Sequence, residues 1–265
     1  MRILLTNDDG INAEGINILA RELEKDHEVI IAAPDDQRSA ASHSITLTKP
    51  ITVKKVELEG IKSKAYSVSG TPADCVRVAL DKLVNGSIDM VVSGINMGVN
   101  LGMDILYSGT VSAAIEANIY KIPSIAVSAE MKDGCIDYHI GAKYIRDILE
   151  KSKDNFIKNH IVLNINTPYI GEDKVKGTKI CKIGNAMFDY YFMEDNDIND
   201  EIVLKVKGRR NNEHEEGTDR YYINEGYVTI TPLRYDLTNF QLLEEVKSWF
   251  QEDWDWKYLK QIYEK

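Results

Sequence analysis

The chain has 265 residues, of which 43% are hydrophobic and 28% are charged, and its formal net charge at pH 7 is −10. This is the composition of a globular chain with enough apolar side chains for a large core, and no apolar run approaches the ~20 residues of a membrane-spanning helix. The acidic balance argues against a nucleic-acid polymer as the main partner, although a bound cation would still let the protein hold a small anion.

Strands and helices alternate over the first two thirds of the chain. In chain order, the patterns predict strands at 2–7, 27–34, 88–96, 122–129 and 160–168, helices at 13–26, 72–84, 110–120 and 138–151, and a β-excursion at 51–58 and 64–70. Asn12 is expected to cap the first helix, and Thr71 precedes Pro72 at the start of the second. Nearly continuous Val/Ile strands joined by helices predict an α/β fold with a doubly wound, mostly parallel sheet and helices on both faces.

The pattern changes after Pro168. Residues 176–234 favour β pairing, the polar stretch 208–220 is expected to form an exposed loop or arm, and 241–250 and 254–265 read as helix. We therefore expect one domain over residues 1–265, with a core at about 1–185 and a β-rich C-terminal oligomerisation extension at about 186–265. Strands that cannot bury themselves within one chain invite pairing with another copy, so at least a homodimer is expected.

The first strand runs into two adjacent acids and a glycine, Asp8, Asp9 and Gly10. Ligands of open α/β sheets lie beyond the carboxyl ends of the strands, and two carboxylates at one such end repel unless a cation lies between them. Asp8 and Asp9 are therefore candidate ligands of a hard divalent metal ion. The alternative is that one acid caps the next helix while the other faces solvent.

Two neutral oxygen donors follow other strands. Ser39 lies in the loop after the second strand, and Asn96 directly ends the strand at 88–96. Both are candidate metal ligands, and both residue types are also common in ordinary turns.

Ser108, Gly109 and Thr110 immediately precede a helix of small residues. Free backbone N–H groups, two hydroxyls and the positive end of a helix favour an anion such as phosphate, and a glycine lets that anion approach. The alternative is an ordinary Ser/Thr helix cap.

The remaining signals are weaker. Gly94, Gly98 and Gly102 do not match the dinucleotide-binding pattern, and His43 is either a substrate contact or a loop histidine without a role. The aromatic residues at 190–192 are expected to pack. Three isolated cysteines, with no zinc or disulfide spacing, favour a reducing cytoplasm, and the N-terminus does not read as a signal peptide.

Taken together, five stretches resemble the SurE family of survival proteins: ILLTNDDG, APDDQRSAASHSIT, SGTPADCV, VVSGINMGVNLGMDILYSGTVSAAIEA and GYVTITPLRYDLT. The resemblance covers residues 1 to about 240. It implies a Rossmann-like core and a swapped C-terminal arm that builds homodimers and often homotetramers. It also implies one divalent metal ion, Mg²⁺ or Mn²⁺, on Asp8, Asp9, Ser39 and Asn96, with phosphate near the stretch 108–110.

Members of this family are metal-dependent phosphatases that act on nucleoside monophosphates. The expected reaction is hydrolysis of a nucleoside 5'-monophosphate to nucleoside and phosphate by a metal-activated water, with Asp8 and Asp9 as catalytic residues. Asn96 and the stretch 108–110 are expected to stabilise charge on the phosphoryl oxygens. The alternatives are a broad-specificity acid phosphatase or exopolyphosphatase and a non-catalytic nucleotide-binding module.

One departure concerns the end of the match. In several relatives a histidine follows the aspartate of the TPLxxDLT motif by four residues, whereas here Phe240 follows Asp236 at that spacing. A general-acid role for that position therefore does not carry over. The tail rich in Trp and Lys matches no motif of the family.

Overall fold

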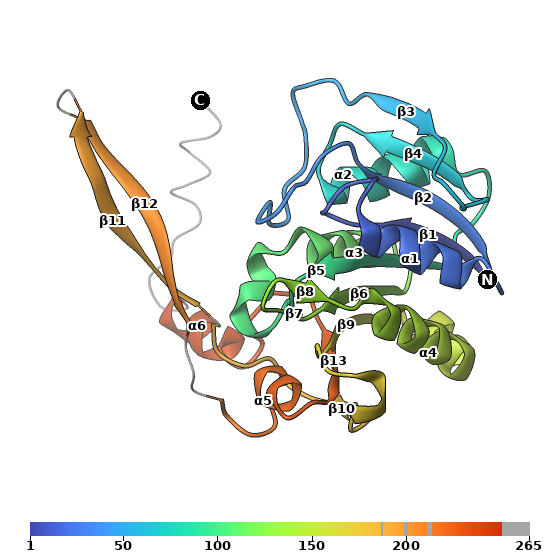
Figure 1. Cartoon of the computed structure of the whole chain (residues 1–265). Coiled ribbons are helices and arrows are strands. Elements are labelled where there is room, and N and C mark those ends of the chain that lie inside the picture. The colour runs from blue at the N-terminus through green and yellow to red at the C-terminus, as the bar shows by residue number, and fades with distance from the viewer. Residues whose placement is uncertain (187, 199–200, 211–213, 251–265) are drawn as a thin grey trace. The chain divides into compact units, whose positions relative to one another are not determined.

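Figure 1 shows the computed structural model of the chain, which describes residues 1–265 except 187, 199–200, 211–213 and 251–265. The chain forms two compact units, Met1–Leu233 and Arg234–Lys265. Among the described helices, none combines the length and the apolar character that crossing a bilayer requires.

The first unit is built on one sheet, which has nine strands in the described part of the chain, in the order β10-β13-β9-β6-β5-β1-β2-β4-β3. Neighbouring strands are parallel except in the pairs β3–β4 and β13–β9. The predicted mostly parallel α/β sheet is therefore confirmed. The strands are β1 (Arg2–Thr6), β2 (Glu28–Pro34), β3 (Val53–Val56), β4 (Lys64–Val68), β5 (Met90–Met97), β6 (Ser124–Ala129), β9 (Val162–Thr167), β10 (Thr178–Ile180) and β13 (Val228–Leu233).

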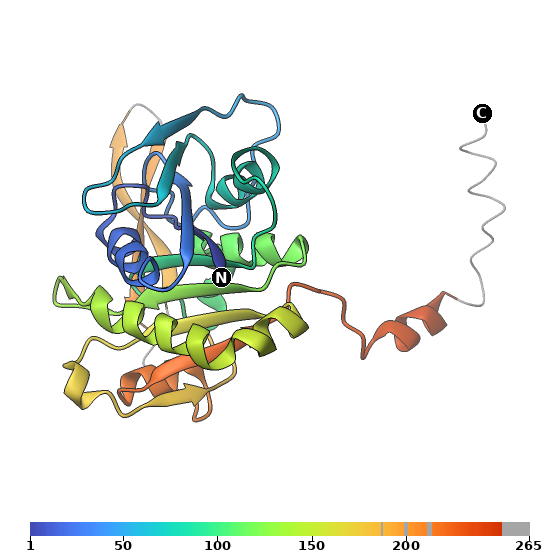
Figure 2. The same cartoon turned by 90° about the vertical axis from the view of Figure 1, so that its right-hand side faces the viewer.

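Helices cover both faces of the sheet (Figure 1 and Figure 2). Successive residues of a strand point to opposite faces, so Leu5 and Ile31 pack with α1 (Glu14–Leu23) and α4 (Tyr138–Asn159). Leu4 and Ile30 pack on the other face with α2 (Pro72–Val78), its π-helical continuation η1 (Ala79–Leu83) and α3 (Gly109–Ile119). This double burial explains why the strands read as continuous apolar runs.

Two helix boundaries differ from the predictions. The N-cap of α1 is Ala13, without a side-chain hydrogen bond, so the expectation that Asn12 caps this helix was wrong. The Ala13 N–H donates to the Gly10 carbonyl oxygen over 3.0 Å, and this turn leaves Asn12 outside the helix start. Helix α4 continues to Asn159 rather than ending at 151. The predicted start of α2 is confirmed, because Thr71 and Asp74 form a capping box before Pro72.

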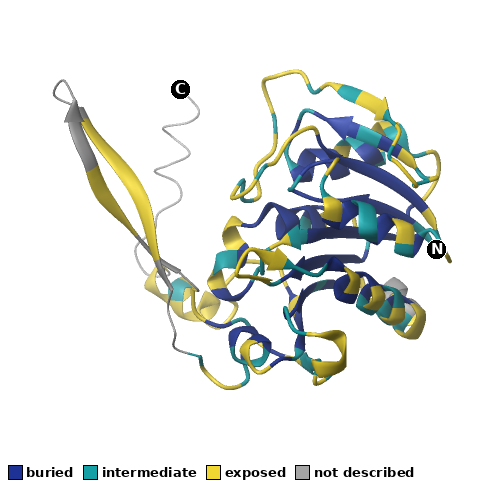
Figure 3. Cartoon of the chain, in the orientation of Figure 1, coloured by how far each residue is buried: buried dark blue, intermediate teal, exposed yellow. Residues whose placement is uncertain are grey.

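The strands β11 (Phe188–Ile198) and β12 (Glu201–Arg210) pair only with each other in the described sheets, as an antiparallel ribbon (Figure 1). Much of this β11–β12 ribbon is exposed (Figure 3), including Tyr191 and Phe192, which were expected to pack. Helix α5 (Asp219–Asn224) then leads into β13. Of the stretch 208–220, expected to be exposed, the last three residues are buried: Thr218, Asp219 and Arg220.

The smaller elements complete the description: η2 (Gly102–Tyr107), β7 (Met131–Lys132), β8 (Cys135–Ile136), η3 (Glu172–Lys174) and α6 (Leu243–Trp249). Helix α6 agrees with the helix predicted at 241–250. The helix predicted at 254–265 lies outside the described residues.

Candidate functional site

The turn after β1 holds the two adjacent acids. The Asn7 side chain brackets this turn, because its Oδ1 accepts from the Gly10 N–H (3.2 Å) and its Nδ2 donates to the Gly10 carbonyl oxygen (2.9 Å). Gly10 has φ +100°, a conformation that side chains rarely adopt. The tight bend therefore fixes Asp8 and Asp9 at the carboxyl edge of the sheet.

Asp8 is buried, with 4% of its surface exposed. Its Oδ1 accepts a hydrogen bond from the Thr110 hydroxyl, and its carbonyl oxygen accepts from the Arg38 N–H over 2.7 Å. The pKa of Asp8 is raised from 3.8 to about 6: burial is the largest cause, the Thr110 hydroxyl opposes the rise, and the neighbouring charge of Asp9 adds to it. A buried carboxylate under such repulsion is stabilised by a cation.

Asp9 connects β1 to β5 and to the loop after β2. Its Oδ2 accepts from the backbone N–H of Met97 over 2.8 Å, and its Oδ1 lies 3.4 Å from Gln37 Nε2. Burial raises the pKa of Asp9 as well, against the opposing effect of these two hydrogen bonds. Both acids therefore carry charge that the surrounding protein only partly compensates.

Ser39 is brought to the same place by the loop after β2. Gln37 Nε2 donates to Ser39 Oγ over 2.9 Å while also reaching Asp9. One amide nitrogen thus lies between the Ser39 hydroxyl and the Asp9 carboxylate. Asp9 Oδ1 and Ser39 Oγ therefore both face the same electropositive group, the side-chain NH₂ of Gln37.

Asn96 reaches the site through an irregularity in β5. Ser93 pairs with Ala126 and Asn96 with Ser128 on β6, so β5 carries one extra residue between these pairs. Bulges of this kind re-aim side chains. The Asn96 amide nitrogen donates to the Gly98 carbonyl oxygen over 2.8 Å, which leaves its Oδ1 as the atom available to a ligand.

The four predicted metal ligands fit a hard cation by the chemistry of their donors. Two carboxylates, a hydroxyl and an amide oxygen are oxygen ligands of the type that Mg²⁺ and Mn²⁺ prefer. Within the described residues, no cluster of three or more His, Cys, Asp or Glu side chains forms a competing metal site. A site with two acids leaves positions for water or for a substrate oxygen.

The start of α3 adjoins this carboxylate pair. Ser108 is the N-cap of α3, and its Oγ accepts from the Val111 N–H over 3.1 Å. The capping alternative therefore holds for the Ser108 side chain but not for Thr110, whose hydroxyl donates to Asp8. The first N–H groups of a helix have no acceptor within it, which gives this end of α3 a partial positive charge. Because Thr110 binds Asp8, this positive end lies beside the carboxylate pair.

Gly109 makes a closer contact than the sequence indicated. A Cβ atom at this position would lie 2.8 Å from Asp8 Cβ and 3.0 Å from Pro72 Cγ. The glycine is thus needed for the approach of α3 to Asp8, a role that the sequence did not indicate. The room that it leaves for phosphate stays a prediction.

His43 has a partner that the sequence did not reveal. Its Nε2 lies 2.7 Å from Glu116 Oε2, and Arg77 donates to the other oxygen of this buried carboxylate over 3.1 Å. The polar loop after β2 is thereby fastened to α2 and α3. In the described structure, His43 has a structural partner and no observed contact with the acid pair.

Several polar residues near the site were missed. Asn164 and Asn166 on β9 both donate to the Asn100 carbonyl oxygen, over 2.8 and 3.0 Å. Their alternation within a buried strand was a usable signal, because both side chains then share one face. Asp219 was missed because it lies in the charged stretch 208–220, which reads as exposed.

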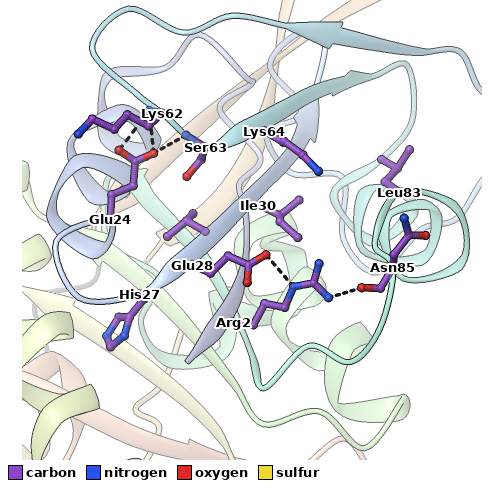
Figure 4. A pocket seen from close by; sticks show the side chains of 11 residues that line it. Arg2, Glu24, His27, Glu28, Ile30, Lys62, Ser63, Lys64, Leu83 and Asn85 are labelled. Atoms are coloured by element: carbon purple, nitrogen blue, oxygen red, sulfur yellow. Dashed lines mark hydrogen bonds and ion pairs between the residues drawn. The ribbon is translucent and has the colours of Figure 1, made fainter.

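A hollow of about 330 Å³ lies at the opposite edge of the sheet, at the amino ends of β1 and β2 (Figure 4). Its acids are already partnered: Glu28 binds Arg2 over 3.0 Å, and Glu24 accepts from the backbone N–H groups of Lys62 and Ser63. This hollow lacks the converging carboxylates of the other edge. Phe240, the departure noted in the sequence, lies in the second unit, where the Arg234 guanidinium is 5.8 Å from its ring.

The model of the family described as "Survival protein SurE" matches residues 3–190. A protein named 5'-nucleotidase SurE from Clostridium botulinum (strain ATCC 19397 / Type A) is 57% identical over 251 residues, which cover 94% of this chain and 99% of that protein. The protein of the same name from Clostridium tetani (strain Massachusetts / E88) is 53% identical, over 94% of this chain and 100% of its own.

A solved structure agrees in fold. The crystal structure of the SurE protein from Aquifex aeolicus superimposes with a TM-score of 0.82 at 36% sequence identity, over 94% of this chain and 99% of that one. With a family model over most of the chain and relatives above 50% identity over nearly all of it, this protein belongs to the SurE family.

Proposed function

We propose that this protein is a metal-dependent 5'-nucleotidase that hydrolyses nucleoside 5'-monophosphates to nucleoside and phosphate. The observation that carries the proposal is the convergence of Asp8, Asp9 and the start of α3 at one edge of the sheet, where the backbone N–H of Met97, the neighbour of Asn96, binds Asp9. The names of relatives 50–57% identical over nearly the whole chain support the same activity.

Asp8, Asp9, Ser39 and Asn96 would hold one Mg²⁺ or Mn²⁺ ion per subunit. Such an ion supplies charge neutralisation at the phosphate and a lowered pKa of a bound water. Asp9 is oriented by the Met97 N–H and Asp8 by the Thr110 hydroxyl, so both carboxylates are fixed before substrate arrives.

The remaining steps fall to protein groups. Asp8 would take the proton of the attacking water beside its role as a metal ligand. The N-terminus of α3, with Ser108, Gly109 and Thr110, and the Asn96 side chain stabilise charge on the phosphoryl oxygens. With Phe240 at the position where several relatives have histidine, protonation of the leaving group falls to water or to another residue.

A panel of substrates tests this function. Phosphate release with Mg²⁺ or Mn²⁺ is measured from nucleoside monophosphates, p-nitrophenyl phosphate and polyphosphate. We expect kcat/KM to be highest for nucleoside monophosphates. Equal values for all monoesters, or preferred cleavage of polyphosphate, would favour the broad-specificity phosphatase or exopolyphosphatase, and binding without release would favour the nucleotide-binding module.

We also propose a homodimer or homotetramer in which the extension at 186–265 makes the contacts, with residues 1–185 as the catalytic core of one domain. On the ribbon, Phe192 pairs with Val206 and Glu194 with Leu204, so Phe192, Leu204 and Val206 share one face. These three apolar side chains are exposed by 65, 52 and 58%. An apolar face of this kind is typical of a surface that a second copy covers.

The cytoplasm is the proposed compartment. All three cysteines, Cys75, Cys135 and Cys181, are free, as expected where thiols stay reduced.

A further inference from the structure

The segment 97–107, here named the site loop, connects the two halves of the candidate site. It begins after Asn96, the candidate metal ligand, and ends at Ser108, the cap of α3. This loop is the covalent link between the metal end and the phosphate end of the site, so a loop displacement that moves either end changes how the two halves are placed. The contacts that hold the site loop in place therefore affect the geometry of the candidate site.

One anchor of the site loop is Asn100. Its backbone N–H donates to Asn166 Oδ1 and its side-chain nitrogen donates to Ser128 Oγ, both over 2.8 Å. Its carbonyl oxygen accepts from Asn164 and Asn166. This anchor belongs to strands of the central sheet.

The second anchor is Asp219, at the start of α5 and far away in the sequence. Its Oδ2 accepts from the Gly102 N–H over 2.8 Å, and its Oδ1 accepts from the Gly184 N–H over 2.9 Å and the Arg220 N–H over 2.8 Å. The side chain is fully buried, with 0% exposed. One carboxylate thus joins the site loop to residue 184, shortly before β11.

The packing around Gly102 reinforces this connection. A Cβ atom on Gly102 would lie 2.1 Å from the Asn185 carbonyl oxygen, so the site loop and the segment 184–186 are in direct contact. Arg220 donates to the carbonyl oxygens of Asn185 and Ala186 over 3.2 and 2.8 Å. The base of the β11–β12 ribbon is therefore clamped to the first residue of η2.

We propose that Asp219 is a positioning residue that couples the base of the β11–β12 ribbon to the phosphate end of the site. Gly102 begins η2, and the N–H of Ser108, the residue after η2, donates to the Ile105 carbonyl oxygen of this short helix. The position of Gly102 therefore affects the position of the residue that caps α3. This proposal rests on the proposed function, because it assumes that the start of α3 binds the phosphate.

Asp219→Asn cuts this coupling selectively. Its oxygen keeps the bonds from Gly184 and Arg220, while its NH₂ group faces the Gly102 N–H and repels it. Glu24→Gln is the matched control, because Glu24 also accepts from two backbone N–H groups but lies at the opposite edge of the sheet (Figure 4).

The affinity for inorganic phosphate is measured by calorimetry in the presence of Mg²⁺, together with the melting temperature. We expect Asp219→Asn to bind phosphate roughly tenfold more weakly, as for a lost hydrogen bond to a charged group, while Glu24→Gln binds it as the wild type does. Equal phosphate affinity in both variants would overturn the proposal, even if both melt at a lower temperature. Phosphate binding needs no turnover, so a failed nucleotidase assay leaves this result interpretable.

Hydrogen exchange supplies a second measurement. Phosphate binding should slow exchange of the Gly184 amide in the wild type and leave it unchanged in Asp219→Asn. An identical response in both proteins would contradict the coupling. If Asp219→Asn does not fold, Arg220→Lys, which weakens the bonds to residues 185 and 186, should lower phosphate affinity, and unchanged affinity would overturn the proposal.

Discussion

Asp8→Asn should stabilise the metal-free protein at neutral pH. Burial, together with the charge of Asp9, raises the pKa of Asp8 from 3.8 to about 6, so the folded protein holds this proton more tightly than the unfolded chain does. Each pKa unit corresponds to about 1.4 kcal/mol, which gives a destabilisation of about 3 kcal/mol when Asp8 is ionised. The Asn side chain keeps an oxygen that can accept from Thr110 and carries no charge.

The sign of the pH dependence follows from this shift. Above the folded-state pKa of about 6, the ionised carboxylate of Asp8 destabilises the fold by the full amount, and below 3.8 both states are protonated and the difference vanishes. The advantage of Asp8→Asn should therefore be largest at pH 7 and shrink steadily as the pH falls from about 6 to about 4.

Urea unfolding in EDTA at several pH values measures this difference. Asp147→Asn, which removes an exposed carboxylate on α4, is the control and should change the free energy of unfolding by less than about 0.5 kcal/mol. Adding metal at 100 times its Kd should stabilise the wild type by about 2.7 kcal/mol and the variant much less, closing the gap. A variant no more stable than the wild type in EDTA at pH 7 would refute the reasoning.

Three further changes test other parts of the site and the assembly. Thr110→Ala removes a hydroxyl that orients Asp8 and does not cap the helix, so kcat should fall roughly ten- to a thousandfold with little change in KM. A lower melting temperature with unchanged kcat would mean that the contact is only structural. Gly109→Val places a branched side chain against Asp8, where even a Cβ would lie 2.8 Å from Asp8 Cβ, and should abolish both turnover and inhibition by free phosphate; near-normal kinetics would contradict the close packing. Replacing Phe192 and Leu204 on the exposed apolar face of the ribbon by Asp should lower the mass measured by light scattering, and a wild type that is already monomeric at micromolar concentration would refute the proposed assembly.

The sequence predicted the sheet well because its strands are buried on both faces. Leu4 and Leu5 point to opposite sides and each meets a layer of helices, so apolar runs and their order were enough. The start of α2 could also be predicted, because Thr71, Pro72 and Asp74 are close in the sequence and Thr71 and Asp74 form the capping box themselves. The cap of α1 could not be predicted, because a backbone hydrogen bond between Ala13 and Gly10, and no side chain, fixes the start of that helix.

For the candidate site, the sequence names candidate residues but does not show their contacts. Parallel strands bring Asp9 and Met97 together, although 88 residues separate them, and the topology alone made that meeting expected. The bond from Thr110 to Asp8 depends on how closely α3 packs, which no local pattern records. Asp219 sits in a charged stretch, and only the tertiary fold shows that its carboxylate is buried against the site loop.

The most direct test of the central claim is the rate of phosphate release from AMP by protein stripped with EDTA, before and after Mn²⁺ is added back, in the wild type and in Asp9→Asn. Asp9 holds the Met97 N–H and would be a metal ligand, so its charge matters for both binding and turnover. We predict that the stripped wild type is inactive, that Mn²⁺ restores its activity, and that Asp9→Asn stays largely inactive at the same metal concentration. Phosphate release that persists in EDTA, or an Asp9→Asn variant that Mn²⁺ restores to the wild-type rate, would contradict the account.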